Sequence, residues 1–418
     1  MTDQPALVLS DTRRRLVVGA LLVGTFLASL EIMVVSPAVP VIVGELGGAG
    51  LYPWVFSAYV ITQTAMMPVY GRLADTWGRR PTNTLAVSLF AGGALACALA
   101  PSMPMLIAAR AVQGLGAGGL VPLTQTIFGD LYTVGDRTRM QAIFSLIWAL
   151  SALLGPAVGG ALTEHWSWRG AFWINLPPAL IAAAIIAVAL PALARTTTRV
   201  RSGLTQGFRT LLRRPLQRAV VASGIALGAA LLGVVGYLPV QIQAVLGGTP
   251  TDAGLAIIPL SLAWTSAAFL AGRLVRPWGF VRLVRLGTLI TAAGAILAAV
   301  DTADMAGLVL FGLGMGLTIS CFNVAVQEDA PADLQGQATA LALLARSIGR
   351  AGGVVAFAWV AGIPPGAEDF AAVVGLEDGL ARVFVAIAVA CSLAAAVVWR
   401  WFRTLGTSEM ASDSSPST

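Results

Sequence analysis

The sequence predicts an all-α integral membrane protein in which twelve transmembrane helices form two pseudo-symmetric six-helix bundles. Three observations lead to this fold class. Of the 418 residues, 57% are hydrophobic and only 11% are charged, a balance that soluble domains do not need and that membrane proteins do. The chain contains twelve apolar stretches long enough to cross a bilayer. A short charged segment after the second of these stretches recurs in the second half of the chain.

The apolar stretches form two sets of six, each close to the ~20 residues that a spanning helix requires. They lie near 16–38, 52–71, 83–100, 104–127, 140–163 and 171–194, then near 217–244, 253–275, 283–300, 305–326, 337–361 and 380–399. We therefore expect an N-terminal bundle at 1–194, a cytosolic linker at 195–216, a C-terminal bundle at 217–405 and a disordered tail at 406–418. The linker composition fits either a short amphipathic helix on the membrane or a disordered basic tether.

The arginines predict the orientation of these stretches. The chain has a net charge of +6, and most arginines lie before the first stretch, at the two charged segments, in the linker and after the last stretch. Arg346 and Arg350 are assigned to the same side. The opposite loops carry acids, among them Glu45, Glu164 and Glu368. By the positive-inside rule, both termini are then cytosolic. Basic charge spread along one membrane face also argues against nucleic acid as a partner.

The recurring charged segment is Gly71–Pro81, which separates two apolar stretches. Its arginines and Asp75 cannot lie in hydrocarbon, so a hairpin at the membrane surface is predicted. A single copy would also fit an ordinary solvated loop. The second copy, Gly272–Gly279, shares five of eight positions with the first and has Arg276 where the first has Asp75. The repeat indicates two related halves whose hairpins carry unequal charge.

Two ionisable residues within the apolar stretches stand out as functional candidates. Glu31 is the only acid well inside one, where an ionised carboxylate costs at least ~2.5–3.5 kcal/mol and needs an ionic partner, a water-filled cavity or a proton. Arg110 opens the fourth stretch and is a fixed positive charge, because arginine does not release its proton. Two alternatives stay open. Glu31 can reach water near the outer interface, and Arg110 can be an outer anchor beside a stripe of helix-packing glycines.

Several of these motifs resemble those of the major facilitator superfamily. Its cytosolic signature loop, Gly-x-x-x-Asp-x-x-Gly-Arg-Arg, is matched at Gly71, Asp75, Gly78, Arg79 and Arg80. The segment beginning Arg110-Ala-Val-Gln113-Gly is similar to the family's fourth-span motif, in which the arginine is associated with proton transfer. A fifth-span motif typical of exporters is matched at Gly155, Pro156, Gly159 and Gly160.

The first span also resembles that of drug:proton antiporters. Over Leu27–Pro40 the chain follows their pattern, with Glu31 in place of the usual aspartate and Met33 in place of a threonine. The segment 237–259 resembles the 14-span branch of these antiporters. The linker is too short for two further spans, so a 12-span version is expected.

The resemblance implies the major facilitator fold and secondary efflux of a drug-like or other organic solute in exchange for protons. It implies no enzymatic activity and no cofactor, since the proton gradient supplies the energy. In agreement, the sequence has no phosphate-binding loop, nucleophile triad or metal-ligand spacing. It further implies a multi-pass monomer of a bacterial cytoplasmic membrane, with protons, a small organic solute and the bilayer as partners. Glu31 would carry the proton, with Arg110 as its electrostatic partner.

Gating and binding residues are also expected. The gating candidates are Gly71, Asp75, Gly78, Arg79, Arg80, Asp130, Gly155, Pro156, Gly159 and Gly160, with Asp130 pairing with Arg79 or Arg72. The substrate-binding candidates are polar or aromatic at membrane depth: Gln63, Gln113, Trp148, Tyr237, Gln241 and Trp264. Two other functions remain open. One is dedicated export of an endogenous metabolite such as a sugar, amino acid or siderophore. The other is a membrane receptor that binds a solute without moving it, which the intact gating motifs disfavour.

Overall fold

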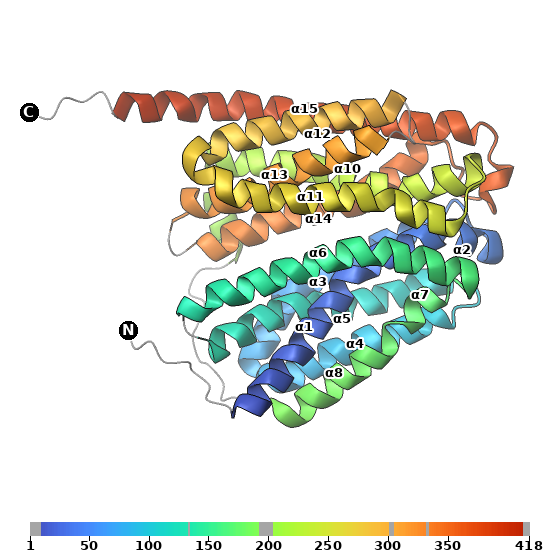
Figure 1. Cartoon of the computed structure of the whole chain (residues 1–418), viewed down its shortest axis with the longest axis horizontal. Helices are drawn as coiled ribbons and strands as arrows, with labels where there is room; N and C mark the ends of the chain where they lie inside the picture. Colours follow the sequence, from blue (N-terminus) through green and yellow to red (C-terminus); the bar gives the residue numbers. More distant parts are fainter. Residues whose placement is uncertain (1–9, 133, 192–203, 301–304, 332–333, 413–418) are drawn as a thin grey trace, which may run out of the picture. The chain divides into compact units, whose positions relative to one another are not determined.

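The computed structural model describes residues 10–132, 134–191, 204–300, 305–331 and 334–412, and no strand occurs within these ranges. The predicted all-α fold class is confirmed (Figure 1). The helices of the first half are α1 (Asp11–Val35), α2 (Val39–Leu46), α3 (Pro53–Thr76), α4 (Arg79–Ala98), α5 (Met103–Leu131), α6 (Val134–His165), α7 (Gly170–Trp173) and α8 (Leu176–Ala189). A short 3₁₀ turn, Ser36–Ala38, joins α1 to α2.

The second half begins with a short helix, α9, and continues with six long ones. They are α9 (Leu204–Leu211), α10 (Pro215–Val240), α11 (Pro250–Trp278), α12 (Phe280–Val300), α13 (Met305–Asp329), α14 (Gln335–Val360) and α15 (Leu376–Ser412). A π-helical turn, Gln241–Val245, extends α10. The formation of α9 agrees with the helical interpretation of the linker, although residues 192–203 lie outside the described ranges. The helix α15 continues past Gly406, where the tail was predicted to begin.

The number of spans agrees with the prediction of twelve. Among the described residues, eleven helical segments are long and apolar enough to cross a membrane. The remaining candidate, α3, has 24 residues, enough to span ~30 Å at 1.5 Å per residue. Polar side chains such as Thr62, Gln63 and Thr64 make it less apolar than the others. They lie on the helix that faces the buried charges described below.

By their internal contacts the residues form two compact units. The first comprises Met1–Arg199, Leu238–Ile258 and Ile363–Leu376; the second comprises Val200–Tyr237, Pro259–Gly362 and Glu377–Thr418. Within the first unit, α1 packs on α5, α6 and α8, while α3 and α4 pack on α5. Within the second, α12 and α13 form the most extensive helix pair.

Small residues let α5 lie close to its neighbours. A Cβ at Gly114 would clash with the backbone of Tyr59 on α3, and one at Gly116 would clash with the backbone of Phe90 on α4. Such contacts drive helix association in membranes, where apolar burial alone gives no preference for protein over lipid. The close packing of α5 brings Arg110 to the interior of the first unit, where it is fully buried.

The two predicted hairpins share a turn. In the first, α3 ends just before Trp77 and α4 follows Gly78, which has φ 97°. In the second, α11 ends at Trp278 and α12 follows Gly279, which has φ 72°. Both glycines adopt the left-handed region that side chains with a Cβ disfavour. The repeat inferred from sequence therefore extends to backbone geometry.

One sequence-based assignment is wrong. Arg346 and Arg350, placed on the cytosolic side by analogy with the other arginines, lie inside α14. Arg346 follows the first residue of this helix by eleven positions, which is about 16 Å along the axis. The positive-inside rule applies to connections, and the small and apolar residues around this pair allow the helix to continue through it.

Candidate functional site

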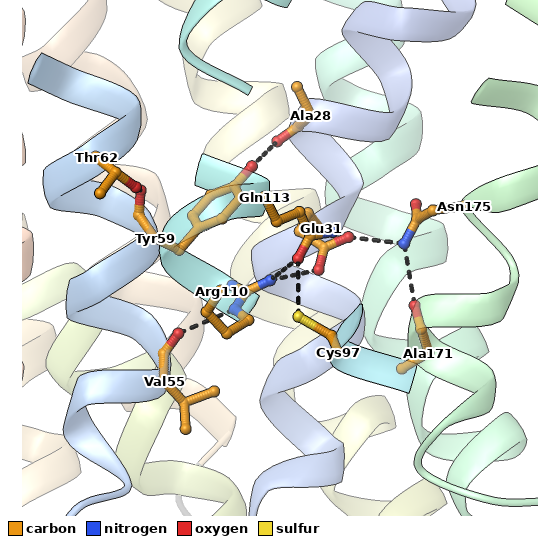
Figure 2. A network of polar contacts seen from close by, with 10 residues as sticks. All are labelled: Ala28, Glu31, Val55, Tyr59, Thr62, Cys97, Arg110, Gln113, Ala171 and Asn175. Carbon is orange, nitrogen blue, oxygen red and sulfur yellow. Dashed lines mark hydrogen bonds and ion pairs between the residues drawn. The ribbon is translucent and has the colours of Figure 1, made fainter. Parts of the chain in front are cut away.

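The first unit contains a fully buried ion pair between α1 and α5. The Nη1 atom of Arg110 lies 2.5 Å from Oε1 of Glu31, and both side chains have an exposed fraction of 0%. Figure 2 shows the two residues pointing toward each other from their helices. Neither side chain lies at the surface of its unit, as the alternative interpretations of these two residues required. The sequence identified both residues without showing that they meet.

Arg110 is held by several further contacts. Its Nε donates to the carbonyl of Val55 on α3 at 3.0 Å, and Nη1 also donates to Oε1 of Gln113, one turn along α5, at 2.8 Å. The guanidinium carbon lies 4.3 Å from the centre of the Tyr59 ring, within the range of a cation–π interaction. These contacts fix the cation against α3 and α5 independently of Glu31 (Figure 2).

The second carboxylate oxygen of Glu31 accepts a hydrogen bond from Asn175. The distance from Asn175 Nδ2 to Glu31 Oε2 is 2.7 Å, and the same nitrogen donates to the carbonyl of Ala171 at 3.1 Å. Asn175 immediately precedes α8 and is fully buried. Sequence analysis missed this residue. The available signal was a lone amide within an apolar stretch, and only the packing of α8 on α1 gives it a role.

The polar network is incompletely satisfied. Within the described part of the chain, Arg110 Nη2 and Asn175 Oδ1 are buried without a hydrogen-bond partner. Cys97 on α4 adds only a weak contact, with Sγ 3.6 Å from Gln113 Oε1. A buried network with open donors and acceptors is costly in a low dielectric.

Three of the expected gating residues meet where the hairpin between α3 and α4 lies against the end of α5. Arg79 Nε lies 2.8 Å from Asp130 Oδ2 at the end of α5, and Arg79 Nη1 lies 3.3 Å from Asp75 Oδ1 on α3. Arg79 is largely buried, whereas Arg80 is half-buried. The expected pairing of Asp130 is therefore made by Arg79. In the second copy Arg276 is exposed, in keeping with the predicted asymmetry of charge.

The glycines of the fifth-span motif form a packing seam on α6. A Cβ at Gly155 would lie 2.6 Å from the Cβ of Met33, and one at Gly159 would clash with the backbone of Val34, both on α1. On another side, a Cβ at Gly160 would meet Pro250 and Thr251 at the start of α11, a segment that belongs to the same unit. These glycines thus allow α6 to contact two helices at backbone distance. Gly71, in contrast, has open space around its Cα.

The six substrate-binding candidates occupy different environments. In the first unit Gln63, Gln113 and Gln241 are buried, and Trp148 is half exposed. Gln113 belongs to the Arg110 network. In the second unit Tyr237 is buried and donates to the carbonyl of Val354 at 2.8 Å, and Trp264 is partly buried. Of the six, Gln113 contacts the ion pair directly.

Comparison with known proteins identifies the family. A model described as Major Facilitator Superfamily matches residues 21–354. The chain belongs to the major facilitator superfamily. It is therefore a multi-pass membrane transporter. Among the described residues no group of His, Cys, Asp and Glu side chains is arranged to hold a metal ion.

Relatives with similar sequences include named efflux proteins. The chain is 26% identical over 403 residues to the multidrug transporter protein MdtP of Bacillus subtilis, covering 82% of this chain and 74% of MdtP. It is 26% identical over 410 residues to the uncharacterized MFS-type transporter Rv1877 of Mycobacterium tuberculosis, covering 84% of this chain and 60% of that protein. The efflux pump dotC of Dothistroma septosporum is 43% identical over 162 residues, which cover 39% of this chain and 28% of dotC.

Solved structures support the fold. An inward-facing, unoccupied bacterial homologue of the human lysosomal transporter Spinster matches with a TM-score of 0.79 at 19% identity, covering 95% of this chain and 98% of that one. A D-xylose–proton symporter matches with a TM-score of 0.68 at 18% identity, covering 93% and 97%. At these identities the likeness extends to the major facilitator fold and not to a substrate.

Proposed function

We propose that this transporter exports a drug-like or other organic solute in exchange for protons by alternating access. The observation that carries the proposal is the buried pair of Glu31 and Arg110. A carboxylate at membrane depth that is paired with a fixed cation is an arrangement whose charge changes when a proton binds. Relatives that are named efflux pumps, such as dotC, support the outward direction of transport.

In the proposed mechanism, protonation of Glu31 changes the contacts that join three helices. With the carboxylate ionised, Glu31 links α1 to Arg110 on α5 and to Asn175 before α8. A neutral acid loses its charge attraction to Arg110, which leaves the guanidinium as a buried cation held by Val55, Gln113 and the rings of Tyr59 and Phe172. An uncompensated charge at this depth favours movement of α1 relative to α5.

The energies indicate why proton and solute would need to act together. Breaking a buried pair by removing one charge costs about 3–5 kcal/mol, whereas each unit of pH gradient supplies about 1.4 kcal/mol. A gradient of one or two units is therefore too small to open the pair alone. Binding energy of the solute would supply the remainder, which couples the two movements.

The hairpin and the glycine seam are proposed to serve the change of access. The Arg79 bridge joins α3, α4 and α5 at one end of the first unit. The seam at Gly155 and Gly159 lets α1 and α6 slide against each other at close range. We further propose that the protein is a monomer of a bacterial cytoplasmic membrane with both termini cytosolic, as the distribution of arginines supports.

Everted membrane vesicles provide the test. A respiratory substrate acidifies the lumen, and a pH-sensitive dye follows the gradient while a panel of cations, neutral drugs and metabolites is added. Exchange predicts that a transported solute accumulates in the lumen and partly dissipates the gradient, and that a protonophore abolishes accumulation. Specific binding without flux would indicate a receptor, and accumulation that survives collapse of the gradient would contradict proton exchange.

A further inference from the structure

The second unit contains two arginines at membrane depth on α14, which the mechanism above does not use. Arg346 and Arg350 are separated by one helical turn and both are partly buried. Arg346 lies about 16 Å from the start of α14, close to the middle of a hydrocarbon layer ~30 Å thick. A charge at this depth costs ~2.5–3.5 kcal/mol or more, so a cavity, a partner or a ligand is expected there.

The hydrogen-bond partner of Arg346 on α13 is a neutral amide. The Nη1 and Nη2 atoms of Arg346 each lie 3.2 Å from Oδ1 of Asn323 on α13. Its aliphatic stem runs past Gly224 on α10, whose added Cβ would lie 3.4 Å from Arg346 Cγ. Within the described part of the chain no carboxylate forms an ion pair with Arg346, in contrast to Arg110 in the first unit. The guanidinium is thus oriented by an amide, and no described carboxylate offsets its positive charge.

Arg350 adds a second cation on the same face of α14. Its Nη2 atom donates to Oγ of Ser347, the residue after Arg346, at 2.9 Å. Like charges at positions i and i+4 repel each other and destabilise a helix. An anion between them would relieve this repulsion, and it would bind through the planar fork that arginine presents to carboxylates, sulfonates and phosphates.

We propose that Arg346, Arg350 and Asn323 form a binding site for the anionic group of an organic solute. The inference rests on the proposed transport function and narrows its substrate class to organic acids, meaning carboxylates, sulfonates or phosphates on an apolar body. A guanidinium has five N–H donors, and the Asn323 oxygen takes two from Arg346. The charge of the two arginines would also disfavour organic cations at this place.

Binding by purified full-length protein in phosphatidylcholine nanodiscs tests the proposal. The probes are aromatic sulfonates and carboxylates, each paired with its own primary amide, such as naphthalene-2-sulfonate and naphthalene-2-sulfonamide. We expect the parent to bind members of the acid series more tightly than their amides. We expect Arg346→Gln to bind the acids roughly tenfold to hundredfold more weakly than the parent does. This decrease corresponds to the free energy of one hydrogen bond to a charged group. The amides should bind equally to both proteins, which also shows that the variant is folded.

Two further variants sharpen the result. Arg346→Lys keeps the charge without the planar fork, so it should give an intermediate affinity for the acids. Arg382→Gln removes an exposed arginine of the same unit and should leave acid binding unchanged. The proposal is wrong if no acid binds better than its amide, or if the preference persists in Arg346→Gln.

Two controls distinguish a lipid site from a solute site, and binding from transport. If phosphatidylglycerol alone stabilises the parent but not Arg346→Gln, and competes with the acids, the site binds a lipid headgroup and the solute assignment is wrong. If gradient-driven exchange works for cations or neutral solutes while Arg346→Gln changes nothing, the transport function stands and only this inference is overturned. If acid preference depends on Arg346 but no solute moves with protons, the inference about binding stands and the proposed transport function is overturned.

Discussion

Replacing Arg110 by methionine would remove the cation of the buried pair while keeping an unbranched side chain in its place. Glu31 would then retain Asn175 as its polar partner but no counter-ion. The least costly response of the buried carboxylate is to take up a proton. For a glutamate that ordinarily titrates near pH 4.3, this costs about 4 kcal/mol at pH 7 and about 1 kcal/mol at pH 5. The folded variant holds this proton and the unfolded chain releases it above pH 4.3, so the variant should lose stability as pH rises.

The assay is unfolding in mixed micelles with increasing dodecyl sulfate at pH 5 and pH 7, followed by tryptophan fluorescence. The matched control is Arg169→Met, which breaks a second Arg–Glu pair of the same length, 2.5 Å, whose side chains are 31% and 47% exposed. That pair lies in contact with solvent, so its loss should cost no more than about 1 kcal/mol at either pH. The double variant Glu31→Gln, Arg110→Met should recover most of the loss. Equal losses for the two single variants, or no pH dependence for Arg110→Met, would refute the reasoning.

Three further predictions concern packing, the hairpin and topology. Gly159→Ala should lower the free energy of unfolding by roughly 1–3 kcal/mol, because the added Cβ meets the backbone of α1. The control Gly19→Ala has open space around the added Cβ and should leave the free energy of unfolding unchanged. Chemical unfolding measures both variants. Asp75→Asn should leave the amount of protein in the membrane unchanged but reduce solute flux in vesicles, and full flux would make the hairpin an ordinary turn. A reporter fused after Arg403 should lie in the cytosol, and a reporter inserted near Gly366 should lie outside the cell. If both reporters lie on the same side of the membrane, the twelve-span topology is wrong.

The spans and the hairpins could be predicted because their signals are local. Hydrophobicity over ~20 residues is set by the cost of exposing backbone and polar groups to lipid, independently of which helices become neighbours. The Trp-Gly turns could be recognised as a repeat because a left-handed backbone position strongly favours glycine. Glu31 and Arg110 stood out for the same reason, as charges in apolar surroundings.

The partners of these residues could not be predicted, because they depend on how helices far apart in sequence pack. Asn175 lies 144 positions from Glu31, and nothing local marks it as a ligand of that carboxylate. Arg346 shows the opposite case. A local rule assigned it to a membrane surface, whereas the contact with Asn323 on α13 gives it a place inside the second unit. In both cases tertiary packing decides the role of a polar residue.

Transport by Glu31→Gln tests the central claim most directly. Glutamine keeps the size and the hydrogen bonds of the side chain but is fixed in the neutral state, so it can bind solute but cannot carry a proton. In proteoliposomes with an imposed pH gradient, we expect this variant to exchange labelled for unlabelled solute at equal concentrations and to lose uphill accumulation. Glu31→Asp, which restores an acid, should retain part of it. If Glu31→Gln accumulates solute against its gradient as well as the parent does, Glu31 is not the coupling residue and the proposed mechanism is wrong.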